Sequence, residues 1–376
     1  MKKFYKILGA GLLAASLVAT SAFANPLTPG GPSTEGRTSM ESIVTYSDMI
    51  KILEDIEHTS KGQVDVFTLD DYGVSEQGRD FYVAKVGNGP KKIWIQAQIH
   101  GDEKLVTEAT LQLLKSLGTN KGDTETQKIL DELTLYVIPM YNPDGAEMNN
   151  RRTLLHENGE STGKWVDLNR DWAEDKLEAD ESMAFYKYWV DVKPDFMVDL
   201  HHQGFKTVPG TNESTSFSLG ISLAPDGPTL PYLDGKYEDK SYNEITRSAQ
   251  AYVYDALKDL GYTHIDRYTV NNGKYEIDIH GGVTSAMMLG LNYQGLNPEG
   301  HSNPAIFFET KGNTREGSLG QRSNGYLTKQ NYLGLRAVLF GLASGEILET
   351  DPEKWNDIPV GEIEGYLTDT GIVPKN

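Results

Sequence analysis

The sequence predicts an α/β fold, in which a mixed, largely parallel, twisted sheet is covered by helices on both faces. Three observations favour this class. From residue 91 onward, apolar runs of strand length alternate with runs of helical periodicity, a pattern typical of parallel strands joined by crossover helices. A hydrophobic share of 38% allows a sizeable core. A length of 376 residues suffices for one large domain, which we place at 41–345.

The N-terminal segment is expected to lie outside this domain. Three lysines precede the short apolar run 7–18, and Ala-Phe-Ala at 22–24 offers a cleavage site, so 1–24 reads as a secretory signal peptide. Residues 25–40 are rich in Pro, Gly, Ser and Thr, which indicates a flexible leader. We therefore expect a secreted protein, extracellular or periplasmic, with no membrane attachment after signal cleavage.

The elements follow from local patterns. A helix is expected over 47–58, where Ser47 or Asp48 can cap its start, and two alternating strands over 63–69 and 80–87. The repeating part is expected to contain strands within 91–100, 133–145, 194–204 and 304–312, and helices within 104–118, 180–192, 246–262 and 325–345.

Two stretches depart from the alternation. Residues 204–243 are dense in Gly, Pro, Ser and Asp, and a loop of that length is often functional, so we expect it at the rim of a site. The acidic segment 346–376 is weakly patterned, and we expect it to pack on the domain.

Composition excludes several kinds of chemistry. The chain has no cysteine, so disulfides, thiolate catalysis and cysteine-ligated zinc are ruled out. A net charge of −19 argues against nucleic acid and anionic membranes as partners.

Polar side chains gather at the ends of predicted strands. His100, His201 and Glu309 each end one, and Glu103 follows His100 by three residues. Ligands bind beyond the carboxyl ends of strands in open α/β sheets, so these side chains should converge. Two histidines and one glutamate, with a fourth position open, form a catalytic zinc set, which predicts one Zn²⁺ per chain. A lone His-x-x-Glu is usually a surface pair, and His202 stays open as an alternative to His201.

Five motifs in order, HGDE, NPDG, DLNRDW, DLH and FFETKG, resemble those of the zinc carboxypeptidases of the metallopeptidase M14 type. The resemblance runs from about Thr45 to Gly345. Asp102 within HGDE looks more like the bacterial secreted branches than the digestive members. The resemblance implies that His100, Glu103 and His201 are the zinc ligands.

The resemblance also implies catalytic roles. Glu309 matches the general base that takes a proton from the attacking water. Arg151 matches the arginine that polarises the scissile carbonyl, with the adjacent Arg152 left open as the alternative. Asp167 would orient His100.

Substrate-binding roles are implied in the same way. Asn169 and Arg170 match the pair that holds the terminal carboxylate of the substrate. Tyr293 is the candidate for the tyrosine that caps the substrate in the family. Specificity residues are expected near 285–294, where Met287 and its two neighbours suggest an apolar pocket or part of the core.

Together these roles imply a secreted, monomeric zinc metallocarboxypeptidase. Its substrate would be a peptide or a peptidoglycan peptide with a free C-terminal carboxylate. Two alternatives remain: an amidase for peptidoglycan stem peptides of the γ-D-glutamyl-diaminopimelate type, and a non-catalytic, peptidase-like binding module.

Overall fold

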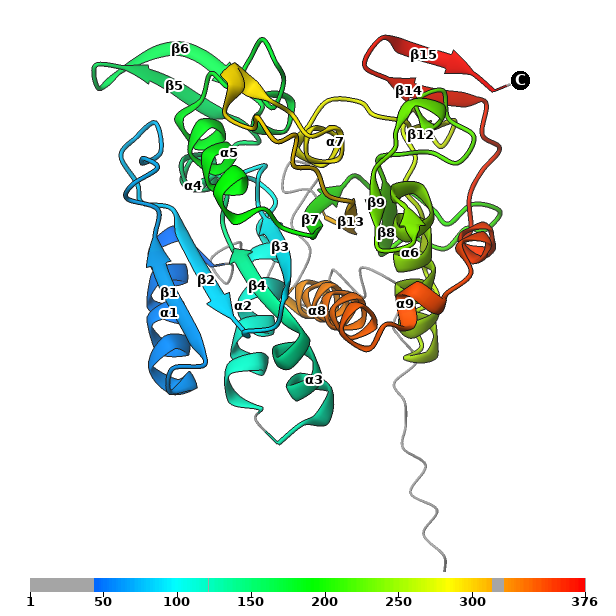
Figure 1. Ribbon diagram of the computed structural model, residues 1–376, viewed down its shortest axis with the longest axis horizontal. Helices are drawn as coiled ribbons and strands as arrows, with labels where there is room; N and C mark the ends of the chain where they lie inside the picture. Colours follow the sequence, from blue (N-terminus) through cyan, green and yellow to red (C-terminus); the bar gives the residue numbers. More distant parts are fainter. Residues whose placement is uncertain (1–43, 121, 313–320, 376) are drawn as a thin grey trace, which may run out of the picture.

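The computed structural model describes residues 44–120, 122–312 and 321–375, with side chains described from 324 onward in the last range (Figure 1). The expected signal peptide at 1–24 and leader at 25–40 lie outside the described residues. None of the helices in the described ranges combines the length and the apolar character needed to cross a membrane.

The predicted mixed sheet is confirmed. Its eight strands lie in the order β1-β2-β4-β3-β7-β13-β8-β11. The middle strands β4, β3, β7 and β13 run parallel, β1 and β2 are antiparallel additions at one edge, and β8 pairs antiparallel with β13. The bounds are β1 Val64–Thr68, β2 Tyr82–Val86, β3 Lys91–Ala97, β4 Leu133–Ile138, β7 Phe196–Gln203, β8 Phe217–Ile221, β11 Ile265–Arg267 and β13 Ala305–Lys311.

Helices cover both faces of this sheet (Figure 1). One apolar cluster joins the sheet to α1, α2, α3, α6 and α8, and a second joins the opposite face to α5 and α7. Successive residues of β3 show the division, since Ile93 and Ile95 belong to the first cluster and Trp94 to the second. The bounds are α1 Tyr46–Ser60, α2 Leu105–Thr119, α3 Thr124–Glu132, α4 Pro143–Glu147, α5 Asp180–Val192, α6 Tyr242–Asp259, α7 Val283–Leu289, α8 Gln321–Ser344 and α9 Glu346–Glu349.

Several short elements were not predicted. The stretch 204–243 is not one long loop, because the buried strand β8 lies within it, followed by a 3₁₀ turn at Leu230–Tyr232 and a small ladder of β9 Lys236–Tyr237 with β10 Lys240–Ser241. An additional hairpin is formed by β5 Thr153–Glu157 and β6 Glu160–Val166.

The segment after residue 345 contributes to the fold. After α9 comes a 3₁₀ helix at Pro352–Asp357, whose Trp355 is 1% exposed and belongs to the first apolar cluster. Strands β14 Gly365–Thr368 and β15 Gly371–Pro374 then form a three-stranded sheet with β12 Tyr275–Ile277.

Candidate functional site

Three side chains that could hold a metal ion converge beyond the carboxyl ends of the central strands. His100 and Glu103 follow β3, and His201 lies on the neighbouring strand β7. One potential ligand atom of each lies within 4.8 Å of the other two, and all three residues are buried. Glu103 Oε1 is 2.8 Å from His100 Nδ1, and Oε2 is 3.2 Å from His201 Nδ1.

The loop after β3 brings the first two of these side chains together. The predicted strand to residue 100 ends earlier, at Ala97, because Gln98 takes a left-handed backbone conformation with φ of 57°. The side-chain amide of Gln98 then donates from Nε2 to the Gly101 carbonyl at 2.7 Å. The backbone amide of Glu103 donates to the His100 carbonyl at 3.0 Å. This turn aims His100 and Glu103 at one point.

Neighbouring carboxylates orient both imidazoles. His201 Nε2 is 2.9 Å from Asp199 Oδ2, and His100 Nε2 is 3.4 Å from Asp167 Oδ1. A carboxylate at Nε2 favours the tautomer with its proton there, which leaves Nδ1 as the metal-binding atom. Burial lowers the pKa of His201, but Asp199 and Glu103 beside it raise that pKa well above its usual range.

The geometry fits a zinc ion. Two nitrogen ligands about 2.05 Å from zinc at a tetrahedral angle would lie about 3.3 Å apart, and the two Nδ1 atoms of His100 and His201 are 3.2 Å apart. Burial raises the pKa of Glu103, but the two imidazoles lower it to well below its usual range, so the third donor is a carboxylate. A set of two imidazoles and one carboxylate suits Zn²⁺.

Glu309 lies beside these ligands. It is on β13, in register with His201 on β7, and both side chains line one cavity of about 100 Å³. Its Oε2 atom is buried without a hydrogen-bond partner among the described residues. Burial raises the pKa of Glu309 to about 8. An unpartnered carboxylate in such a place is costly to bury, which favours a role toward a bound molecule.

Arg151 lines the same cavity. Its Nε donates to Asp167 Oδ2 at 2.8 Å, and its Nη1 lies 3.2 Å from His100 Nδ1. Asp167 thus touches both Arg151 and His100, and these two groups hold its pKa below the usual range despite burial. Arg152, the alternative left open by the sequence, is exposed and does not line the cavity.

Asn169 and Arg170 close another side of the cavity, on the 3₁₀ turn Leu168–Arg170. The Asn169 Oδ1 atom accepts from the Val283 amide at the start of α7, at 3.0 Å. Asn169 Nδ2 lies 3.4 Å from His201 Nε2. Arg170 donates from Nη1 to the Asn169 carbonyl at 2.6 Å, and its side chain remains exposed.

Comparison with known proteins shows which family this site region resembles. Residues 52–192, which contain the first two metal-binding side chains and Arg151, match the family model for zinc carboxypeptidase. This part of the chain is similar to the zinc carboxypeptidase family. Carboxypeptidase M of Mus musculus is 26% identical to this chain over an alignment of 193 positions, and the match covers 46% of this chain and 43% of that protein. The chain therefore covers less than half of this curated relative.

Solved structures of carboxypeptidases share the fold. A metallo-carboxypeptidase from Burkholderia cenocepacia superposes with a TM-score of 0.54 at 19% identity, covering 81% of this chain and 70% of the other. A metallo-carboxypeptidase from Pseudomonas aeruginosa gives the same TM-score and identity, covering 80% of this chain and 69% of the other.

The structure places Tyr293 away from the other predicted residues. Tyr293 is in the 3₁₀ turn Tyr293–Gly295, packs edge-on against Tyr186 at 6.2 Å, and accepts at its hydroxyl from the Gln294 amide. It does not line the cavity that holds Glu309. The turn is tied to α5 instead, because the Tyr293 amide donates to the Tyr186 hydroxyl at 2.9 Å.

Tyr268 lines the cavity and was not singled out from the sequence. It directly follows β11, and its ring packs edge-on against Phe307 at 5.2 Å. The nearby Glu309 carboxylate, together with burial, raises the pKa of Tyr268 well above its usual range, so the hydroxyl keeps its proton. The signal in the sequence was its place at the end of a strand, but the three-residue strand β11 was not predicted.

His202 has a structural partner. Its Nε2 accepts from the Leu105 amide at 3.2 Å, at the first residue of α2. Burial lowers the pKa of His202 to about 4, which keeps this acceptor neutral. The side chain therefore ties β7 to α2, while His201 joins the metal-binding group.

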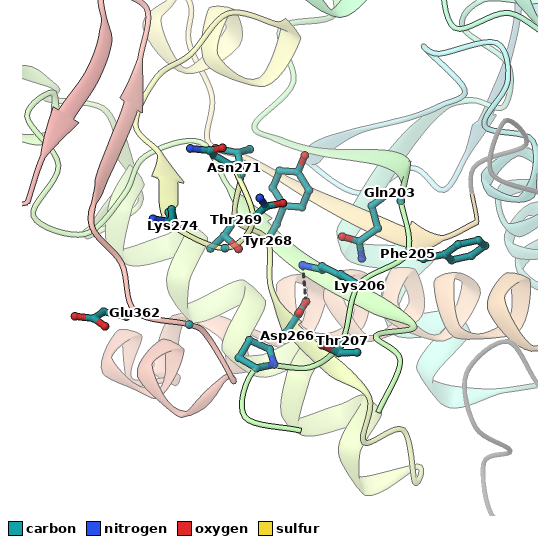
Figure 2. A pocket seen from close by; sticks show the side chains of 16 residues that line it. Gln203, Phe205, Lys206, Thr207, Asp266, Tyr268, Thr269, Asn271, Lys274 and Glu362 are labelled. Atoms are coloured by element: carbon teal, nitrogen blue, oxygen red, sulfur yellow. Dashed lines mark ion pairs between the residues drawn. The ribbon is translucent and has the colours of Figure 1, made fainter. Parts of the chain in front are cut away.

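A second, larger cavity of about 670 Å³ shares the lining residue Tyr268 with the first; Figure 2 shows its lining. Tyr268 lines both, and Gln203, two residues after His201, lines the second. Its polar wall includes an ion pair of 3.1 Å between Lys206 and the buried Asp266. Asn271 and further polar side chains complete the wall (Figure 2).

The apolar pocket suggested near 285–294 is divided between core and surface. Met287 and Met288 are buried in the second apolar cluster. Leu289 lines a separate cavity of about 340 Å³ together with Trp172.

Proposed function

We propose that this protein is a zinc-dependent metallocarboxypeptidase that hydrolyses the last peptide bond of peptides with a free C-terminal carboxylate. The observation that carries the proposal is the gathering of His100, Glu103 and His201 with the unpartnered Glu309 and with Arg170 around one cavity. Two imidazoles and one carboxylate would hold one zinc ion per chain. When bound, zinc supplies Lewis-acid chemistry that polarises a carbonyl and activates water near neutral pH.

Arg170 and Asn169 would select the chain terminus. A guanidinium offers parallel N–H donors that match a carboxylate, which a lysine cannot reproduce. An internal peptide has no carboxylate at this position, so binding there makes the reaction an exopeptidase reaction. Asn169 is held by the Val283 amide, which fixes its amide group beside Arg170.

Glu309 would move the proton. In its ionised form, Glu309 would accept a proton at Oε2 from the attacking water and then deliver it to the nitrogen of the leaving amine. Arg151 would stabilise the negative charge that develops on the carbonyl oxygen, since its Nη1 lies beside the metal-binding atom of His100. Asp167 holds Arg151 in this place through its 2.8 Å hydrogen bond.

Tyr268 would donate a hydrogen bond to the substrate, the role that the sequence suggested for Tyr293. Its hydroxyl keeps its proton and its side chain lines the cavity. The substrate residues before the scissile bond would extend past Tyr268 and bind in the 670 Å³ cavity. Tyr268 lines both cavities, and Gln203 lines the larger one. Amide and hydroxyl groups on its wall suit the main chain of a peptide or of a peptidoglycan peptide.

The location and the oligomeric state of the enzyme are part of the same proposal. The basic start, apolar run and small-residue site of 1–24 support secretion. We propose that the protein acts as a monomer, because one chain alone brings the three metal-binding side chains, Glu309 and Arg170 to a single cavity.

The Glu309→Gln variant tests the proposal. Loss of the base should lower kcat about 10²- to 10⁴-fold, while metal analysis still finds one zinc per chain, because the three ligands are intact. Glu299→Gln, which changes an exposed glutamate paired with Lys193, is the matched control and should keep full turnover. Unchanged turnover in Glu309→Gln would show that Glu309 is not the base. Tight peptide binding by the zinc-loaded wild type without turnover would favour the binding-module alternative.

A further inference from the structure

The loop between β12 and α7 forms one wall of the proposed substrate site. Ile277, His280, Gly281 and Thr284 from this region line the cavity together with Asn169 and Arg170. The loop 278–282 has an unusual backbone, because Ile279 has φ of 56°, Gly281 of 37° and Gly282 of 111°. A β-branched residue such as Ile279 rarely adopts this region, so surrounding contacts must hold it there.

One of those contacts comes from Ser222, whose carbonyl accepts from the Ile279 amide at 2.7 Å, and the others come from the C-terminal hairpin β14–β15. Thr368 and Gly371 face each other across the ladder, so Asp369 begins the two-residue tip. The Asp278 amide donates to the Leu367 carbonyl, and the Asp369 amide donates to the Ile279 carbonyl, both at 3.0 Å.

The Asp369 side chain extends this anchoring into the wall of the site. Asp369 Oδ1 accepts from the Gly281 amide at 2.5 Å. One residue earlier, the carbonyl of Thr368 lies 3.0 Å from Nδ1 of His280. The hairpin tip therefore binds three successive residues, Ile279 to Gly281.

The loop in turn sets the position of the carboxylate-binding pair. A Cβ atom on Gly282 would lie 2.5 Å from Asn169 Oδ1, and one on Gly281 would lie 3.5 Å from Arg170 Cδ. The backbone thus packs directly against both side chains. A shift of the loop would move the surface against which Asn169 and Arg170 are packed.

We propose that Asp369 is a positioning residue for the substrate carboxylate, acting through Gly281 and the loop 278–282 on Asn169 and Arg170. This inference rests on the proposed function. The side chain of Asp369 is 58% exposed, so it adds little to the core. Its Oδ1 atom supplies the hydrogen-bond acceptor for the Gly281 amide. Residue 369 lies far outside the range 52–192 that matches the family model.

The test compares Asp369→Ala, which removes the acceptor, with Asp369→Asn, which keeps an Oδ1 atom. In the full-length zinc-loaded protein, Asp369→Ala should raise KM for a peptide with a free carboxylate about tenfold, with kcat changed less than about twofold, because binding and not chemistry is disturbed. Asp369→Asn should stay within about twofold of wild type in both constants. Asp131→Ala, an exposed aspartate on α3, is the control.

Hydrogen exchange provides a readout independent of turnover. Peptides covering 278–283 should exchange faster in Asp369→Ala than in wild type, and as slowly as wild type in Asp369→Asn. Unchanged exchange in the alanine variant, or unchanged KM with faster exchange, overturns the inference. If Asp369→Ala does not fold, Asp369→Gly, which also lacks a side-chain acceptor, takes its place with the same expected outcomes. If the wild type shows no turnover, the proposed function fails, and calorimetric affinity for the same peptide decides the inference in place of KM.

Discussion

Glu309 and Tyr268 illustrate what a single residue contributes to the site. Glu309 sits in register with His201 on the adjacent parallel strand, so the proposed base and a candidate metal ligand are fixed by the same ladder. Tyr268 reaches the cavity from a short strand on the far side of β8. Its protonated hydroxyl beside Glu309 is suited to donate to a carbonyl or to a leaving nitrogen.

The paired variants Tyr268→Phe and Tyr293→Phe separate the two tyrosines. Removing the Tyr268 hydroxyl should lower kcat/KM about tenfold, the value of one lost hydrogen bond in the transition state. Tyr293→Phe should leave kcat/KM within about twofold of wild type, since that hydroxyl faces Gln294. Steady-state kinetics on one peptide checks both. The opposite ranking would restore Tyr293 as the capping residue.

A site residue can be predicted from the sequence when its side chain has a specific chemistry and it also lies at a recognisable position in an element. His100, Glu103 and His201 combine metal-binding side chains with strand ends, and the structure gathers all three. Tyr268 has no metal-binding side chain, and the residues before it show no strong strand pattern. The choice between Arg151 and Arg152 needed the structure, because only the turn of the chain decides which of two neighbours faces the cavity.

At the scale of elements, the loop after β3 depends on its close approach to α4. A Cβ atom on Gly101 would lie 2.1 Å from the backbone carbonyl carbon of Gly145. Because Gly101 has no side chain, the turn with His100 and Glu103 can pack directly against α4. Asn142 supports the same contact by accepting from the Gly145 amide at 2.7 Å.

Gly101→Ala should therefore displace the metal-binding turn. We expect a loss of roughly 1–3 kcal/mol in unfolding free energy and at least about tenfold weaker zinc binding. Gly122→Ala is the control, since nothing lies within 4 Å of its added Cβ atom, and its effect should stay within about 0.5 kcal/mol. Chemical denaturation and a competitive zinc titration measure both quantities. Equal zinc affinity in the two variants would contradict this role for Gly101.

The elements that the sequence revealed are those with strong periodicity. The long helix α1 buries one apolar face and the central strand β7 is buried along its whole length, so each shows a strong apolar pattern. The hairpin of β5 and β6 was missed because β6 is exposed along six of its seven residues. Strand β8 lies within a Gly- and Pro-rich stretch whose composition suggested a loop, and burial between β13 and β11 decides its conformation.

At the scale of the whole molecule, buried carboxyl groups couple stability to pH. Glu181 is fully buried on α5, accepts from the Thr153 hydroxyl at 2.8 Å, and has no partner for Oε2 among the described residues. Burial, with the nearby Asp144, raises the pKa of Glu181 from 4.5 to about 8. Between these pH values the folded state binds a proton that the unfolded state lacks. Its contribution to stability is complete below pH 4.5 and falls as pH rises to about 8.

Glu181→Gln should remove this pH dependence and keep the bond from Thr153. We expect the variant to exceed wild type in unfolding free energy at pH 8.5 by on the order of 1–3 kcal/mol. The difference should shrink toward pH 4.5. Denaturant titrations across this pH range measure it, with Glu160→Gln on the exposed strand β6 as the control. Parallel pH profiles for wild type and Glu181→Gln would show that Glu181 is ionised in the folded protein.

The C-terminal segment links the whole molecule to the site. It contributes Trp355 to one apolar cluster and the hairpin tip with Asp369 to the wall of the cavity. The sequence predicted that 346–376 packs on the domain, but its acidic and weakly periodic pattern could not indicate pairing with β12, which is set by contacts between distant parts of the chain.

The central claim is that the site recognises a free chain terminus. The most direct measurement incubates the zinc-loaded protein with two peptides that differ only in a C-terminal carboxylate or carboxamide, and follows the products by mass spectrometry. We expect loss of single residues from the end of the carboxylate peptide and no cleavage of the amide, because Arg170 and Asn169 then lack their anion. Equal cleavage of both peptides, or cleavage at internal bonds, would contradict it.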